Sequence, residues 1–294
     1  MTSVLKEYRP PGNLTEYLPD PCEPIDRWFQ ARNASNVRTT VRIVRDLCPD
    51  ADLFVDPLAG GGSSACAARL LGLPFFGIEL DPLLACVCLA KSVAGPEDAS
   101  TLPSRVDPDQ PVASCLSVAR RLSASTERPV SDGEMLADLE GGPNASAGSH
   151  VLWGDATQAA VWDELHEETR RAVLYTSPPF GFSSPRPEPH AWLRTEAELA
   201  LTAAKAARSG TGPGTFPSYD QIASAVVFCA AQRFRRLTVI LEHEPADDGS
   251  DSRVPTIRRL TESLGSRIRD VRVLECGVYS PRGLFSLIVF EVTQ

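Results

Sequence analysis

Long apolar runs are missing from this chain of 294 residues. No segment reaches the roughly 18 consecutive apolar residues that a membrane-spanning helix needs, which excludes such a helix. The segment from Met1 to Pro11 is charged and contains proline, so it lacks the apolar centre of a secretory signal peptide. We therefore expect a cytoplasmic protein with no membrane partner.

Paired cysteines are also missing. The eight cysteines show no C-x-x-C spacing, and most have apolar neighbours, as in Ala65-Cys66-Ala67. Disulfide frameworks and zinc sites usually show close, regular cysteine spacing. Free buried thiols are the favoured interpretation, and no metal site is expected.

Positive charge is scarce. The net charge is −9, the isoelectric point is near 5.1, and lysine occurs only at Lys6, Lys91 and Lys205. Proteins that bind long nucleic-acid duplexes normally carry a basic surface, because phosphate contacts supply most of their affinity. The charge balance therefore counts against a long duplex as the partner.

Apolar residues, by contrast, make up 43% of the chain, enough for the core of one large α/β domain. Short apolar strands alternate with segments of helical spacing, a pattern typical of a parallel sheet covered on both faces. The last two strands are close enough in the sequence to pair antiparallel. We predict an α/β, doubly wound (Rossmann-like), mostly parallel sheet of seven strands with an antiparallel last strand. The predicted strands are 52–56, 74–80, 150–153, 172–175, 237–241, 270–276 and 284–292, and the predicted helices are 25–47, 63–71, 82–93, about 157–169, 219–233 and 253–264.

Two long stretches interrupt this alternation, at about 94–149 and 181–216. Both are rich in small and turn-forming residues, and each contains one helical stretch. Connections of this length are unusual inside a compact domain, so we expect insertions that serve as tolerated surface segments, as a lid or as disordered loops. The predicted organisation is an N-terminal arm at 1–24 and one domain at 25–294 that carries both insertions.

A Gly-rich turn follows the first predicted strand, at Asp56-Pro57-Leu58-Ala59-Gly60-Gly61-Gly62-Ser63. Glycines let the backbone approach a ligand closely, and the helix that starts here presents free N–H groups to an anion. Glu79 ends the next strand, where a carboxylate can accept hydrogen bonds from ribose hydroxyls. The turn therefore indicates a nucleoside cofactor.

The same turn fits other interpretations. Gly60, Gly62 and Ala65 satisfy G-x-G-x-x-A, the pattern of NAD-dependent oxidoreductases. The turn could also be purely structural. Asp56 favours S-adenosylmethionine, because a carboxylate suits an ammonium group better than it suits a pyrophosphate.

The fourth predicted strand ends in the turn Ser177-Pro178-Pro179-Phe180. Two prolines cannot continue a β-ladder, so they fix a rigid turn at the ligand-binding edge of the sheet. The Ser177 hydroxyl and a nearby carbonyl could accept hydrogen bonds from an amine, which frees its lone pair to attack a methyl sulfonium. Phe180 would supply a face for a ring or a positive charge. The alternative is an ordinary Pro-rich loop start.

Two more polar groups follow predicted strands. Asp155 could accept a hydrogen bond from the adenine amine, or it could cap a helix. His243, flanked by Glu242 and Glu244, could take the proton lost from a methylated nitrogen, or it could begin a solvated loop.

Taken in order, five motifs resemble those of bacterial amino-methyltransferases of the DNA N4-cytosine/N6-adenine type. The motifs are Trp28-Phe29-Gln30-Ala31-Arg32, Asp56 to Ser64, Gly77 to Pro82, Gly154 to Ala156, and Thr176 to Phe180. The similarity covers about 25–93 and 150–182, and a serine before the two prolines is similar to the N4-cytosine branch. The resemblance implies a class I methyltransferase fold with S-adenosyl-L-methionine as cofactor.

The resemblance also implies residue roles. The Gly-rich turn would hold the methionine part of the cofactor, Glu79 the ribose and Asp155 the adenine. Ser177 to Phe180 would hold the target nitrogen, and the segment around 28–36 would fold over the cofactor. The predicted cofactor-binding residues are Trp28, Arg32, Asn36, Asp56, Pro57, Ala59, Gly60, Gly62, Ser63, Glu79, Leu80, Asp155, Ala156 and Ser177, and the predicted catalytic residues are Ser177, Pro178, Pro179, Phe180 and His243.

The chain departs from the DNA enzymes in three respects. Its turn reads Ala-Gly-Gly-Gly in place of Phe/Cys-Gly-Ser-Gly, Phe180 replaces the commoner tyrosine, and no basic target-recognition domain is evident. We therefore expect the methyl acceptor to be an amino nitrogen of a peptide or small-molecule natural product. A DNA or RNA base of the N4-cytosine type is the first alternative. An NAD-dependent oxidoreductase and a non-catalytic nucleic-acid-binding relative are the others.

Overall fold

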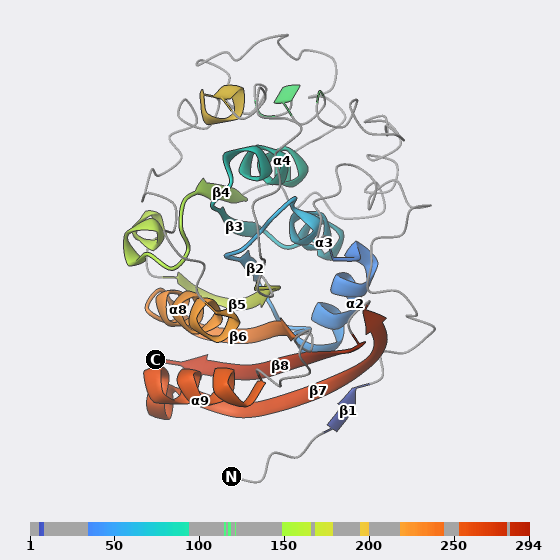
Figure 1. Cartoon of the computed structure of the whole chain (residues 1–294), viewed down its shortest axis with the longest axis vertical. Coiled ribbons are helices and arrows are strands. Elements are labelled where there is room, and N and C mark those ends of the chain that lie inside the picture. Colours follow the sequence, from blue (N-terminus) through green and yellow to red (C-terminus); the bar gives the residue numbers. More distant parts are fainter. Residues whose placement is uncertain are drawn as a thin grey trace.

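The structure is a computed structural model that describes residues 6–8, 35–93, 115, 117–118, 121, 149–165, 168–178, 195–199, 218–243, 253–280 and 283–294. One twisted sheet runs through these residues, and helices pack on both of its faces (Figure 1). No helix within these ranges is long and apolar enough to cross a membrane.

The sheet has eight strands in the described part of the chain, in the order β1-β7-β8-β6-β5-β2-β3-β4. Strand β8 runs antiparallel to β6 and β7, and the other pairs are parallel. Strands β2 to β8 confirm the predicted doubly wound, mostly parallel sheet of seven strands, in which the last strand is antiparallel. The bounds are β1 Lys6–Tyr8, β2 Leu53–Asp56, β3 Phe75–Glu79, β4 His150–Trp153, β5 Glu168–Thr176, β6 Phe234–His243, β7 Ile268–Ser280 and β8 Gly283–Thr293.

Strand β1 comes from the predicted N-terminal arm and extends the sheet at one edge. It pairs in parallel with β7, with Lys6 opposite Leu274 and Tyr8 opposite Cys276. Three residues carry too little alternation to predict a strand. The edge of β7 supplies the hydrogen-bonding partner that the local sequence does not reveal.

Consecutive residues of each buried strand face opposite helix layers. Phe54 packs toward α2, α3 and α4, whereas Leu53 and Val55 pack toward the layer of α8 and α9. Figure 1 shows these two layers on opposite sides of the sheet. The helices of the first layer are α2 Val37–Leu47, α3 Ser63–Leu71 and α4 Pro82–Val93, and those of the second are η2 Ala159–Glu164, α8 Tyr219–Ala231 and α9 Arg253–Leu264.

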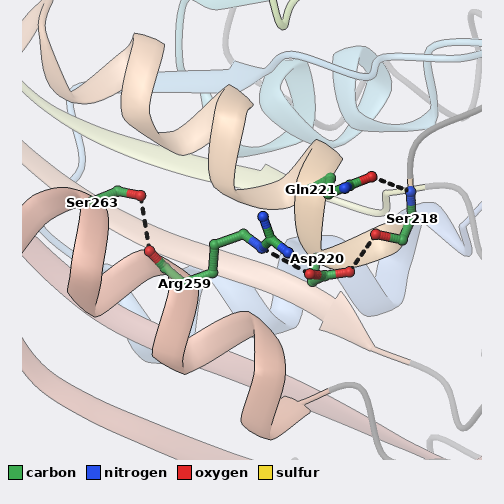
Figure 2. Close-up of polar contacts among 5 residues, drawn as sticks. All are labelled: Ser218, Asp220, Gln221, Arg259 and Ser263. Atoms are coloured by element: carbon green, nitrogen blue, oxygen red, sulfur yellow. Dashed lines mark hydrogen bonds and ion pairs between the residues drawn. The ribbon is translucent and has the colours of Figure 1, made fainter.

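The second layer is also joined by polar contacts between α8 and α9 (Figure 2). The Gln221 side chain accepts a hydrogen bond from the backbone N–H of Ser218 at 3.0 Å, and Arg259 Nε donates to Asp220 at 2.8 Å. Burial opposes the charge of Asp220, but the Ser218 hydroxyl and the Arg259 guanidinium lower its pKa. The start of α8 is therefore capped and tied to the neighbouring helix.

Two predicted helices differ from the structure. The helix expected over 25–47 begins only at Val37 in the described residues, because Asn36 is extended and caps it. The other is wrong in type and length. The segment expected to be helical to about residue 169 forms the short 3-10 helix η2, and β5 already begins at Glu168. Glu168 pairs with Phe234 and Arg171 with Arg236, so the charged start of β5 becomes a strand by pairing with β6. Tertiary pairing overrides the local helix preference here.

The described parts of the two predicted insertions lie side by side on α4. Cys115 and Ala197 are both buried, and the sulfur of Cys86 on α4 lies 3.1 Å from that of Cys115 and 3.7 Å from the carbonyl of Ala197. Arg121 forms a two-pronged ion pair with Glu196. Segments that are distant in the sequence thus share one layer over this helix.

Candidate functional site

The carboxyl ends of β2, β3, β5 and β6 meet at one edge of the sheet. The last residue of each strand is polar, and it is either a predicted site residue or the neighbour of one in the sequence. Asp56 ends β2, Glu79 ends β3, Thr176 ends β5 and His243 ends β6. In open α/β sheets this edge is where ligands bind. The candidate site is built on it.

The Gly-rich turn is a tight connection between β2 and α3. Gly60 and Gly62 have φ of +50° and +77°, values that favour glycine. A Cβ on Gly62 would also lie 2.8 Å from the Cα of Cys88 on α4. Glycine therefore lets the start of α3 pack directly on α4, while Pro57 and Ala59 are buried behind the turn.

Asp56 is a buried carboxylate at the centre of the site, 6% exposed. Its Oδ1 accepts hydrogen bonds from the Leu58 N–H at 3.1 Å and from the Thr176 hydroxyl at 2.8 Å. Burial raises the pKa of Asp56, and these hydrogen bonds oppose the rise. The result is a fixed carboxylate next to the turn.

The start of α3 has an unpaired polar atom. Ser64 Oγ is buried and has no hydrogen-bond partner within the described residues, although it is near enough to Asp56 to lower the pKa of that carboxyl. An unpaired buried hydroxyl costs about 1–3 kcal/mol, which a bound polar group would recover. Together with Ser63 and the N–H groups of the first turn, it fits the anionic end of a ligand.

Glu79 connects the turn to β3. Its Oε2 accepts from the Gly60 N–H at 2.7 Å and its Oε1 from the Asp81 N–H at 2.8 Å. Burial raises the pKa of Glu79 to about 7 despite these bonds. The neighbouring Leu80 is 39% exposed, unusual for a large apolar side chain, and its carbonyl accepts from Trp153 Nε1 at 3.0 Å. A carboxylate beside an exposed apolar side chain fits a ribose joined to a flat base.

Asp155 and Ala156 follow β4 and already have local partners. Asp155 Oδ1 accepts from both the N–H and the hydroxyl of Thr157, at 2.9 and 2.7 Å. The Ala156 carbonyl accepts from Trp162 Nε1 at 2.8 Å. Asp155 therefore stabilises a turn and caps no helix, because the next helix, η2, begins only at Ala159 with Gln158 as its N-cap. Contact with adenine stays a prediction for both residues.

The predicted acceptor turn is described as far as Pro178. The pairing of β5 with β6 ends at Thr176, which is fully buried; Ser177 is half-buried and Pro178 is buried. Strand β5 thus ends just before the two prolines, which cannot continue a β-ladder. Pro179 and Phe180 lie outside the described residues, as do Trp28 and Arg32.

Asn36 has a clear structural position. It is the N-cap of α2, and its side chain accepts from the Thr39 N–H at 2.9 Å. Capping explains an asparagine at this position. Its predicted contact with the cofactor stays a prediction.

A carboxylate that the sequence indicates only as a neighbour of His243 lies one residue beyond Leu241, the sheet partner of Thr176. Glu242 is fully buried, and it accepts hydrogen bonds from the Tyr175 hydroxyl and, at 3.3 Å, from the Ser35 hydroxyl. The Tyr219 hydroxyl donates to its backbone carbonyl at 2.6 Å. The available signal was a glutamate ending the apolar run of β6.

His243 is buried rather than solvated, with 2% of its surface exposed. Its ring lies edge-on to Tyr219, with centroids 5.5 Å apart, and its Nδ1 is 3.3 Å from the Ser286 hydroxyl. The solvated-loop interpretation is therefore wrong for this residue. A role as a base stays a prediction.

No protein-family model matches the chain, and no curated protein sequence matches it. Among solved structures, the chain resembles the magnesium protoporphyrin IX methyltransferase of Synechocystis PCC 6803 with bound SAH, at 11% identity over 88% of this chain and 81% of that one, with a TM-score of 0.40. It resembles an rRNA methylase from Streptococcus thermophilus at 11% identity, over 90% of this chain and 100% of that one, with a TM-score of 0.36. It also resembles EvdMO1 at 9% identity and a TM-score of 0.39, over 90% of this chain but only 43% of EvdMO1. Likenesses this weak transfer no activity, so the function has to be argued from the residues of this chain.

Proposed function

We propose that the chain is an S-adenosylmethionine-dependent N-methyltransferase. The observation that carries the proposal is the 2.8 Å hydrogen bond from the Thr176 hydroxyl to Asp56. Asp56 opens the Gly-rich turn and Thr176 directly precedes Ser177, so this bond joins the predicted cofactor turn to the predicted acceptor turn. A cofactor on the first turn and an amine on the second would be neighbours, which is what a transfer reaction requires.

The residues around the Gly-rich turn match the parts of this cofactor. Asp56 would hold the ammonium group, and the first turn of α3 with Ser63 and Ser64 would hold the carboxylate. Glu79 would accept from the ribose hydroxyls, with Leu80 and Asp155 beside the adenine. The cofactor supplies an electrophilic methyl group when it is bound.

The acceptor side is built from the end of β5 and the end of β6. The hydroxyl and carbonyl of Ser177 would accept hydrogen bonds from the amine, so that its lone pair points at the methyl group. His243 lies two residues beyond Leu241, the partner of Thr176 in the sheet, and is the proposed acceptor of the released proton.

The charges of the described residues favour an amine of a peptide or small natural product over a nucleobase. Carboxylates of Asp56, Glu79 and Glu242 lie at the carboxyl edge, while Arg171 and Arg236 lie near the amino ends of β5 and β6, at the opposite edge. None of the charged side chains named at the carboxyl edge would attract a phosphate, since all three are acidic. A DNA or RNA base of the N4-cytosine type is the alternative acceptor.

Calorimetry with the whole purified chain tests the cofactor. We expect S-adenosylhomocysteine to bind, NADH not to bind, and Asp56→Asn to weaken the binding of S-adenosylhomocysteine at least about tenfold, since a charge-assisted contact is lost. Glu262→Gln removes an exposed carboxylate on α9 and is the matched control, with wild-type affinity expected. Binding of NADH without binding of S-adenosylhomocysteine would overturn the proposal in favour of an oxidoreductase.

A labelling experiment tests the acceptor. The chain is incubated with methyl-labelled S-adenosylmethionine and an extract of its host, which is then separated into peptide, small-molecule and nucleic-acid fractions. We expect label in a peptide or small-molecule fraction that is absent with Asp56→Asn. Label confined to nucleic acid would select the alternative acceptor, and cofactor binding without any label would indicate a non-catalytic relative.

A further inference from the structure

Thr176 is fully buried at the last position of β5, and it belongs to neither the predicted cofactor set nor the predicted catalytic set. We propose that Thr176 is a positioning residue for the cofactor, whose hydroxyl keeps the Asp56 carboxylate charged and oriented to receive the cofactor's ammonium group. This inference rests on the proposed function, because it presupposes that Asp56 meets an ammonium group.

The orientation of the Asp56 carboxylate follows from which of its two oxygens accepts hydrogen bonds. Oδ1 of Asp56 accepts both from the Leu58 N–H, at 3.1 Å, and from the Thr176 hydroxyl, at 2.8 Å. Two donors on one oxygen fix the rotation of the carboxylate. Oδ2 is then the oxygen that remains for a cation arriving at the edge of the sheet.

The charge of Asp56 is opposed by most of its surroundings. Burial is the largest influence and raises its pKa. Among the described residues, Glu79 of β3 and the Cys88 thiol of α4 interact with it electrostatically from neighbouring elements, and neither is a cation. The hydrogen-bond donors that favour the ionised form are the Leu58 N–H and the Thr176 hydroxyl, and the nearby Ser64 hydroxyl, which forms no hydrogen bond with the described residues, lowers the pKa in the same direction.

Loss of the Thr176 hydroxyl therefore has a predictable chemical consequence. The pKa of Asp56 rises further, so a larger share of the protein carries a neutral carboxyl at a given pH. A neutral carboxyl binds an ammonium group less tightly than a carboxylate does. The deficit in binding should grow as the pH falls, which a loss of packing alone does not produce.

The test compares two ligands and three side chains by calorimetry between about pH 6 and about pH 8. S-adenosylhomocysteine carries the ammonium group, whereas 5′-methylthioadenosine has the same nucleoside without the amino-acid part. For Thr176→Val, which keeps the shape and removes the hydroxyl, we expect about tenfold weaker binding of S-adenosylhomocysteine near neutral pH and a larger deficit toward pH 6. Binding of 5′-methylthioadenosine should be unchanged, and Thr176→Ser should restore both ligands to within about twofold of wild type.

Each other outcome has a distinct meaning. Equal losses for both ligands, without pH dependence, would assign Thr176 a purely structural role and overturn the inference. Wild-type binding of S-adenosylhomocysteine by Thr176→Val at every pH would also overturn it. If the wild-type chain binds neither ligand, the proposed function itself fails. Should Thr176→Val not fold, as judged by its thermal transition, Thr176→Ala carries the same comparison, because it also removes the hydroxyl and places no apolar methyl group beside Asp56.

Discussion

Glu79 shows how burial and hydrogen bonding compete at one side chain. Two backbone N–H groups stabilise its charged form, but burial is the larger effect and raises its pKa from 4.5 to about 7. Between these pH values the folded protein keeps a proton that the unfolded chain has released. The resulting stabilisation is fully present below the unfolded pKa and is lost as the pH rises through about 7.

This loss of stability with rising pH gives a prediction for Glu79→Gln, whose side chain cannot ionise. The difference in melting temperature, wild type minus variant, should fall by at least about 3 °C between about pH 5 and about pH 8, since 1 kcal/mol corresponds to about 2–4 °C for chains of this size. Thermal denaturation at both pH values measures it. Glu262→Gln, on an exposed position of α9, should show no such change. A constant or growing difference for Glu79→Gln would mean that Glu79 is already charged in the folded state near pH 5.

The sequence predicts the position of a polar residue in the fold when that residue lies at the end of a recognisable strand. Asp56, Glu79 and Asp155 each follow a short apolar run, and the structure places each near the same sheet edge. Thr176 is different, because threonine is an ordinary strand residue and its partner Asp56 is 120 positions away. Only the adjacency of β2 and β5 brings the two side chains together.

At the scale of elements, the close approach of α3 to α4 depends on Gly62. Its φ of +77° and the Cβ overlap with the Cα of Cys88, at 2.8 Å, are two separate demands for glycine. Gly265 shares only the first, since its φ is +56° and nothing lies within 4 Å of a Cβ built there. Substitutions at Gly265 and Gly62 can therefore measure the cost of backbone strain separately from the cost of disturbing the packing of α3 on α4.

We predict that Gly265→Ala costs about 1–2 kcal/mol of unfolding free energy, the cost of a left-handed conformation. Gly62→Ala should cost about 1–3 kcal/mol more, because backbone atoms of α4 must move. Urea denaturation of both variants measures the difference. Equal losses would show that α3 and α4 can separate without cost.

A helix or strand is predicted correctly when neighbouring residues in the sequence determine where it begins and ends. Helix α3 begins and ends at glycines with positive φ, Gly62 and Gly72, so its bounds are predicted correctly at 63–71. The start of β5 and the whole of β1 depend instead on strands that the sequence places elsewhere. Local preference fails where a distant edge supplies the hydrogen bonds.

At the scale of the whole molecule, Glu242 links three parts of the chain. It is fully buried in β6 and bonds through its side chain to Tyr175 of β5 and to Ser35, which lies just before α2. Ser35 is 207 positions away, so no sequence pattern reveals the contact. A buried carboxylate of this kind is held in place by its donors, and removing one donor leaves it partly unpaired.

Double-mutant cycles measure that linkage. Tyr175→Phe should cost about 2 kcal/mol of unfolding free energy, and its cycle with Glu242→Gln should show a coupling of about 1 kcal/mol, because each substitution removes or weakens the hydrogen bond between the two side chains. Tyr219→Phe is the matched control, since the Tyr219 hydroxyl donates to the backbone carbonyl of Glu242 and not to its side chain. Its cycle with Glu242→Gln should be additive within about 0.5 kcal/mol. Additivity in both cycles would mean that the Tyr175 hydroxyl does not stabilise the buried Glu242 side chain.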